Sequence, residues 1–181
     1  LIPKDMILFG AFPHAHYRGQ SSKLTLRLPD GSEEVLLSLP RYDFNWQRQY
    51  EFKKPIDVPA GSKLIAHYTY DNSERNPANP DPSLEITWGD QSFEEMLFTA
   101  FMYRWKDETG DDMKPEYDEM MESTRGFTML DDNIDGQLSK AELKGETGQR
   151  IAAYFDRVDR DHDGNLTLEE YSQLAVAMNQ R

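Results

Sequence analysis

Short segments of alternating apolar and polar residues dominate the first part of the chain. In segment 23–28, Lys-Leu-Thr-Leu-Arg-Leu, the three leucines point to one face of an extended strand. An Asp30-Gly31 pair separates it from segment 34–39, and Asp-Gly between two such segments predicts a hairpin. We expect further strands at 49–52, 63–70 and 96–105, a turn at 58–61 and an irregular proline-rich segment at 76–82. Short strands at this spacing predict an antiparallel sandwich or jelly roll.

The pattern changes after residue 106. Segment 107–114 is polar, as linkers between domains are, and a helical pattern follows from Pro115, a residue suited to a first helical turn. The sequence therefore predicts a mainly β domain at 1–106, a linker at 107–114 and a small all-α module at 115–181.

Charge and composition narrow the function classes. The net charge is -13, of which residues 107–181 carry -11, and this disfavours a nucleic-acid partner because phosphate binding needs clustered Lys and Arg. No apolar run approaches the roughly 20 residues that a membrane span needs. The chain has no cysteine, so any metal must be bound by His, Met or carboxylates.

Two twelve-residue segments, 131–142 and 159–170, place oxygen-bearing side chains at alternate positions around a central glycine. This is the arrangement of a calcium-binding EF-hand loop, in which the side chains and one backbone carbonyl supply oxygen ligands and a final glutamate supplies two. The alternative is that they are solvated turns, but two full matches disfavour it. The candidate calcium ligands are Asp131, Asn133, Asp135, Gln137, Ser139 and Glu142 in the first loop, and Asp159, Asp161, Asp163, Asn165, Thr167 and Glu170 in the second.

The residues around the loops predict that they form a pair. Leu138 and Leu166 occupy the same loop position, where paired hands pack across a short strand pair, and Phe127 and Phe155 each precede a loop by four residues. The loops start 28 residues apart, which is shorter than in the calmodulin-like pairs that they resemble. We therefore favour a structural or low-affinity calcium role over a sensor role.

His14 and His16 lie two residues apart on an extended segment, so both imidazoles face the same side and can reach one metal ion. Taken alone, a His-x-His pair is as often surface decoration as a ligand pair. His67 lies in no such motif and is interpreted as an ordinary strand residue. Met96 opens an apolar strand, and on that basis alone it would be a core residue.

The stretch 10–105 resembles the second catalytic domain of the copper type II, ascorbate-dependent monooxygenases, the family of peptidylglycine and dopamine hydroxylases. The resemblance is carried by His14, His16 and Gly19, by the Asp57-Val58-x-x-Gly61 turn, and by Glu94-Glu95-Met96 before an apolar strand to Tyr103. It implies that His14, His16 and Met96 bind one copper. Two imidazoles and a thioether are soft ligands that favour copper, notably Cu(I). Glu94 and Glu95 are interpreted as exposed turn carboxylates.

Several positions depart from that family. Residues that grip a peptide carboxylate in the amidating members correspond to Phe12, Phe98 and Ala100, so a peptide-glycine substrate is not expected. The cysteine that follows the methionine in animal members is Leu97. The family's first domain, which carries a second copper, is absent from this chain, and the chain alone is therefore expected to be inactive.

Two functions remain open at this stage. The leading hypothesis is an oxygen-activating copper domain that hydroxylates C–H bonds of a small-molecule substrate, with an external reductant, an upstream copper or electron-transfer domain and an EF-hand appendage. The alternative is a non-catalytic copper- and calcium-binding or electron-transfer module of a multidomain exported protein. A third, weaker possibility is that calcium-dependent docking to a partner is the main task and the β domain is a scaffold. The family resemblance leads us to expect a periplasmic or secreted location.

Overall fold

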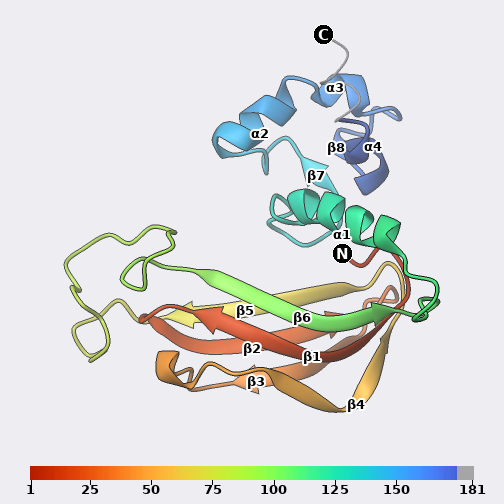
Figure 1. Cartoon of the computed structure of the whole chain (residues 1–181). Helices are drawn as coiled ribbons and strands as arrows, with labels where there is room; N and C mark the ends of the chain where they lie inside the picture. Colours follow the sequence, from red (N-terminus) through yellow and green to blue (C-terminus); the bar gives the residue numbers. More distant parts are fainter. Residues whose placement is uncertain (175–181) are drawn as a thin grey trace. The chain divides into compact units, whose positions relative to one another are not determined.

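The computed structural model describes residues 1–174, apart from the side chain of Ser123, and its chain forms two compact units. One comprises residues 2–113, and the other comprises residues 114–181 together with Leu1. The division falls at the end of the segment 107–114 that the sequence analysis placed between two modules. The first unit is made of antiparallel β sheets, and the second is small and helical (Figure 1).

Six strands of the first unit form two three-stranded sheets, with the orders β4-β1-β6 and β3-β2-β5. All neighbouring strands are antiparallel. The predicted Asp-Gly hairpin is confirmed: Arg27 pairs with Glu33, and Gly31 adopts a positive φ of 86° at the turn. The strands are β1 (Met6–Ala15), β2 (Gly19–Arg27), β3 (Glu33–Leu39), β4 (Tyr50–Val58), β5 (Lys63–Tyr70) and β6 (Leu97–Trp105).

Four predicted strands are confirmed, but the sequence analysis missed β1 as a strand and ended β4 too early. β1 is nearly continuously apolar in sequence, so it shows no alternation of apolar and polar residues, although buried and partly exposed residues alternate along much of it. Pro13 fits because β4 pairs with β1 only as far as Ala11, which leaves no partner strand on that side. Pro55 is tolerated in β4 because β4 is an edge strand.

Buried side chains from both sheets make the core of this unit, among them Leu8 of β1, Leu26 of β2 and Trp105 of β6. The sheets are also joined by the Tyr68 hydroxyl of β5, which donates to the Phe98 carbonyl of β6 at 2.8 Å. An antiparallel β architecture is therefore established, whereas the jelly-roll topology stays a prediction.

The second unit consists of short helices around two loops. It comprises α1 (Pro115–Thr128), β7 (Leu138–Ser139), α2 (Gly145–Ala152), α3 (Phe155–Val158), β8 (Asn165–Leu166) and α4 (Leu168–Ser172). As predicted, Leu138 pairs with Leu166, and both lie in a buried cluster with Phe127 and Phe155. No helix in the described residues has the length and apolar character needed to cross a membrane.

Candidate metal centres

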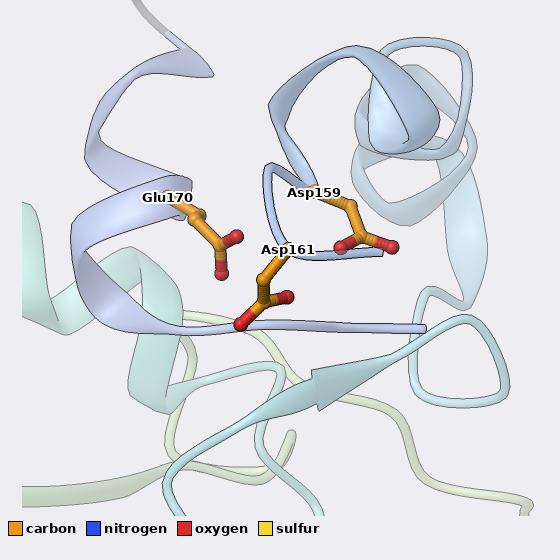
Figure 2. Close-up of side chains that lie close together, drawn as sticks. All are labelled: Asp159, Asp161 and Glu170. Atoms are coloured by element: carbon orange, nitrogen blue, oxygen red, sulfur yellow. The ribbon is translucent and has the colours of Figure 1, made fainter. Parts of the chain in front are cut away.

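The loop 159–170 brings three carboxylates together. One oxygen each of Asp159, Asp161 and Glu170 can be chosen so that all lie within 4.8 Å of one another, and no other such group of His or carboxylate residues occurs in the described chain (Figure 2). Asp159 and Glu170 are only 5% and 6% exposed. Asp159 Oδ1 is buried and has no hydrogen-bond partner among the described residues. A buried oxygen without a donor is the expected state of a ligand that a cation satisfies.

Hydrogen bonds within the loop hold Glu170 in place. Its Oε2 accepts from the Thr167 backbone N–H at 2.9 Å and from the Thr167 hydroxyl at 2.8 Å, while Oε1 accepts from the Arg160 N–H at 2.8 Å. The Thr167 backbone bond is the largest of the effects that lower the pKa of Glu170. Glu170 is therefore ionised at neutral pH, as a calcium ligand must be.

The other predicted ligands of this loop lie along its turn. Asp163 Oδ1 accepts from the Asn165 N–H at 2.7 Å, which shapes the second half of the loop. Gly164 has a φ of 86°, and its N–H donates to Asp159 Oδ2 at 3.2 Å. The sharp turn needs this left-handed glycine because a side chain would strain it.

Loop 131–142 also has a glycine turn at its centre, but its carboxylates accept a different set of hydrogen bonds. Both oxygens of Asp131 accept backbone N–H groups, from Asp135 at 3.0 Å and from Gly136 at 2.9 Å. Glu142 Oε2 accepts from the Ser139 N–H and hydroxyl at 2.9 and 2.8 Å. Burial raises the pKa of Glu142, but the bonds from Ser139 and Asn133 outweigh it and the pKa is lowered.

The remaining predicted ligands of the first loop also bind one another. Asn133 Nδ2 donates to Asp135 Oδ2 at 2.8 Å, and the Gln137 N–H donates to Asp135 Oδ1 at 2.8 Å. The carboxylates of this loop do not converge as those of the second loop do. The two loops therefore differ in how closely their carboxylates converge, although both sequences match the EF-hand pattern equally well.

His14 and His16 lie side by side where β1 ends. Their ring centroids are 5.1 Å apart and the rings are nearly perpendicular. His14 contacts Gln47 Oε1 through Nδ1, and because Gln47 Nε2 donates to the Phe44 carbonyl at 2.9 Å, its Oε1 faces His14 as an acceptor. In the tautomer that donates from Nδ1 to Gln47, the Nε2 lone pair of His14 can bind a metal.

His16 is 4% exposed, and its Nδ1 is buried without a hydrogen-bond partner among the described residues. Its ring meets Phe44 edge-on at 6.4 Å. Phe44 belongs to a short 3-10 helix, η1 (Phe44–Trp46), capped by the Asp43 carboxylate, which accepts the Asn45 N–H. The segment 43–47 thus supplies a wall and a hydrogen-bond partner to the histidine pair, and neither was predicted.

Met96 lies immediately before β6, whose register against β1 pairs His14 with Phe98 and Ala15 with Leu97. Continuing this register by one residue places Met96 opposite His16. His67, by contrast, is exposed on β5 and pairs with Lys23 of β2, so it lies apart from the histidine pair as predicted.

Three side chains hold the ends of the strands that carry these residues. The Tyr42 hydroxyl accepts from the Ala15 N–H and donates to the Ala15 carbonyl, both at 2.9 Å. The Tyr68 hydroxyl accepts from the His14 N–H at 3.2 Å. Arg18, 2% exposed, donates to Asn72 and to the Phe93 carbonyl, which anchors the long connection between β5 and β6. These contacts join distant residues, so no local pattern pointed to them.

The interpretation of Glu94 and Glu95 as exposed turn carboxylates is wrong. Both side chains are half-buried, and Glu95 Oε2 is fully buried. Glu95 Oε1 accepts from the His16 and Met96 backbone N–H groups. The connection between β5 and β6 contacts the residues that follow β1, since Arg18 donates to the Phe93 carbonyl and the His16 N–H donates to Glu95.

Comparison with known proteins supports one of the two centres. A protein-family model described as EF hand matches residues 151–175, which include the second loop. No curated protein matches the chain. The EF-hand match, together with the convergent carboxylates, supports calcium binding by the C-terminal unit.

Proposed function

We propose that the C-terminal unit is a calcium-binding module in which loop 159–170 is the tighter site. The observation that carries the proposal is the convergence of Asp159, Asp161 and Glu170, with a buried carboxylate oxygen that lacks a donor. Asp163, the carbonyl of Asn165 and Thr167 would complete the shell. Loop 131–142 would bind more weakly, because its carboxylates do not converge as those of loop 159–170 do.

Calorimetric calcium titration of the chelator-stripped protein tests this order of affinity. We expect two binding events in the wild type. Glu170→Gln should abolish the tighter event, because it removes one oxygen and the charge of the residue that closes the loop. Glu142→Gln, the same change in the first loop, should abolish the weaker one. Loss of the tighter event in Glu142→Gln instead would refute the assignment.

We further propose that the β unit binds one copper ion through His14, His16 and Met96. Three observations support this ligand set. The two imidazoles are adjacent, and Nδ1 of His16 is buried without a hydrogen-bond partner among the described residues. Met96 follows Glu95, whose carboxylate accepts from the His16 N–H, and directly precedes Leu97, which pairs with Ala15. Such a soft ligand set favours Cu(I) over calcium or magnesium.

Copper bound there would supply one-electron redox chemistry toward dioxygen, and hydroxylation of a C–H bond in a small molecule is the reaction that the family resemblance implies. Gln47 would orient the His14 imidazole, Tyr68 would hold the His14 backbone N–H, and the site would stay open to a substrate. The exposed apolar side chains of Leu97 and Phe98, which pair with Ala15 and His14, suit such access. A copper-binding or electron-transfer module without catalysis is the rival function.

Copper titration separates these possibilities in two steps. The wild type should bind one equivalent with the Cu(II) EPR spectrum of a type 2 site, and His14→Ala and Met96→Ala should weaken binding. His67→Ala is the matched control and should bind as the wild type does. Copper binding indifferent to His14 and Met96 would remove the site. If binding holds, copper- and ascorbate-dependent hydroxylation of small molecules supports catalysis, and its absence, even with a partner electron donor, supports the non-catalytic module.

A further inference from the structure

One carboxylate oxygen connects the two segments that carry the proposed copper ligands. Glu95 Oε1 accepts from the His16 backbone N–H at 3.3 Å and from the Met96 backbone N–H at 2.9 Å. His16 and Glu95 are 79 residues apart in the sequence. The strand ladder between β1 and β6 stops one residue earlier, at the pair of Ala15 and Leu97. Glu95 therefore continues the connection between the two strands where backbone pairing ends.

The direction of the Glu95 side chain is set by its own backbone. The Glu95 N–H donates to the Thr87 carbonyl at 3.1 Å, and the Glu95 carbonyl accepts from the Gly89 N–H at 3.0 Å. Arg18 holds the Phe93 carbonyl two residues earlier. The carboxylate is thus presented to His16 from a fixed turn, so little conformational entropy is lost when its two bonds form.

Glu95 is not itself a ligand shared with both histidines. Across the described residues, only Asp159, Asp161 and Glu170 bring three ligand atoms of His or carboxylate groups within 4.8 Å. Glu95 Oε2 is nevertheless buried and has no hydrogen-bond partner in the described chain, as is His16 Nδ1. Two unpartnered polar atoms thus lie on residues that one hydrogen bond joins, and such buried polar atoms call for an explanation beyond packing.

We propose that Glu95 is a positioning residue that holds the His16 and Met96 segments together so that imidazole and thioether can reach the same copper ion. This inference rests on the proposed copper site. A carboxylate suits the task because charge-assisted hydrogen bonds to backbone N–H groups are stronger than neutral ones. Without it, two N–H groups at the end of the ladder lose their acceptor and the Met96 segment is held less firmly against His16.

The test compares Glu95→Ala and Glu95→Gln with Glu94→Ala. The glutamine amide oxygen can accept the same two bonds, whereas alanine removes both. Glu94 is the matched control because its carboxylate accepts from the Gln91 N–H in the same turn and touches neither proposed ligand segment. Three quantities are measured: Cu(I) affinity by chelator competition, the sulfur contribution to copper X-ray absorption, and amide hydrogen exchange at His16 and Met96 without metal.

Glu95→Ala should lower Cu(I) affinity about 10- to 100-fold and lose the sulfur contribution while the nitrogen contribution remains. Amide exchange at His16 and Met96 should accelerate in the same variant. Glu95→Gln should restore all three readouts close to the wild type, and Glu94→Ala should leave them unchanged. A merely destabilising substitution would not remove sulfur selectively or be rescued by glutamine.

The outcomes separate this inference from the copper proposal. If the wild type and Glu94→Ala bind no stoichiometric copper, the copper site fails, and amide exchange still decides whether Glu95 joins the two segments. If copper binds but Glu95→Ala keeps the sulfur contribution and normal exchange, the positioning role is overturned. A Glu95→Gln variant as impaired as Glu95→Ala would likewise overturn it, because the two hydrogen bonds would not be the cause.

Discussion

Removing the Tyr42 hydroxyl should destabilise the β unit, because this one group makes two hydrogen bonds to the backbone at the end of β1. This hydroxyl accepts from the Ala15 N–H and donates to the Ala15 carbonyl, at 2.9 Å each. β4 pairs with β1 only as far as Ala11, so the hydroxyl supplies hydrogen bonds where no β4 residue pairs with Ala15. Tyr42→Phe keeps the ring and leaves the N–H and carbonyl of Ala15, a fully buried residue, without these partners.

The magnitude follows from two buried backbone groups. An unsatisfied buried donor or acceptor costs about 1–3 kcal/mol, and Tyr42 is only half-buried, so water relieves part of the loss. We expect a decrease in the free energy of unfolding of about 2–4 kcal/mol. With a urea m-value of about 1–3 kcal/mol/M, the midpoint of unfolding should fall by roughly 1 M or more.

Tryptophan fluorescence measures this unit alone, because Trp46, Trp88 and Trp105 all lie in residues 2–113. Tyr70→Phe is the control: its hydroxyl makes one longer bond, to the Met96 carbonyl at 3.3 Å, and should cost under about 1 kcal/mol. If Tyr42→Phe is no less stable than Tyr70→Phe, the hydroxyl does not stand in for a strand and the reasoning is refuted.

The same hydroxyl gives a dependence on alkaline pH. Burial is the main reason why the pKa of Tyr42 rises from its ordinary 10.0 to about 12. The folded state therefore favours the protonated phenol, so this stabilisation is complete below pH 10 and is lost as pH rises from 10 to 12. The difference in thermal midpoint between wild type and Tyr42→Phe should narrow over that range. A constant difference would show that the hydroxyl does not titrate as expected.

Three further changes test other parts of the molecule. Leu166→Ala should lower the stability of the C-terminal unit by about 2–5 kcal/mol and weaken calcium binding at both loops, because Leu166 is buried and pairs with Leu138 of the other loop. Circular dichroism measures the stability, and calorimetry measures the calcium binding. Weaker binding at one loop only would contradict the pairing argument. Gly10→Ala should lower the free energy of unfolding of the β unit by about 1–3 kcal/mol, since a Cβ there would lie 2.4 Å from the Tyr50 carbonyl oxygen. Unfolding monitored by fluorescence measures the change, and an unchanged midpoint would contradict this expectation. Gly110→Ala, with open space around it, should be neutral in the same assay, so a clear loss there would show that the method overstates glycine effects.

How far sequence predicts this fold depends on the pattern that each strand carries. Segment 23–28 of β2 alternates in sequence, which located that strand, and the Asp30-Gly31 turn located β3. β1 is nearly continuously apolar and shows no alternation in sequence, so it was missed. β4 was cut short because Pro55 looks like a break, although an edge strand needs no N–H there.

The calcium loops and the proposed copper site differ in how far sequence predicts them. All calcium ligand candidates lie within twelve-residue loops, so their order along the chain carries the geometry. The histidine pair is also local, but Gln47 is 33 residues from His14, and Glu95 is 79 residues from His16. The sequence around Gln47 or Glu95 does not predict these contacts, because they depend on how distant segments of the chain meet at the end of β1.

The distance along the chain between His16 and Glu95 also bears on how the protein acquires its structure. A contact across 79 residues closes a large loop and forms only after β1, β5 and β6 have come together, whereas either calcium loop can close within one short segment. Calcium can therefore act on the C-terminal unit through a local segment. The residues around His16, by contrast, reach their arrangement only once distant parts of the β unit have come together.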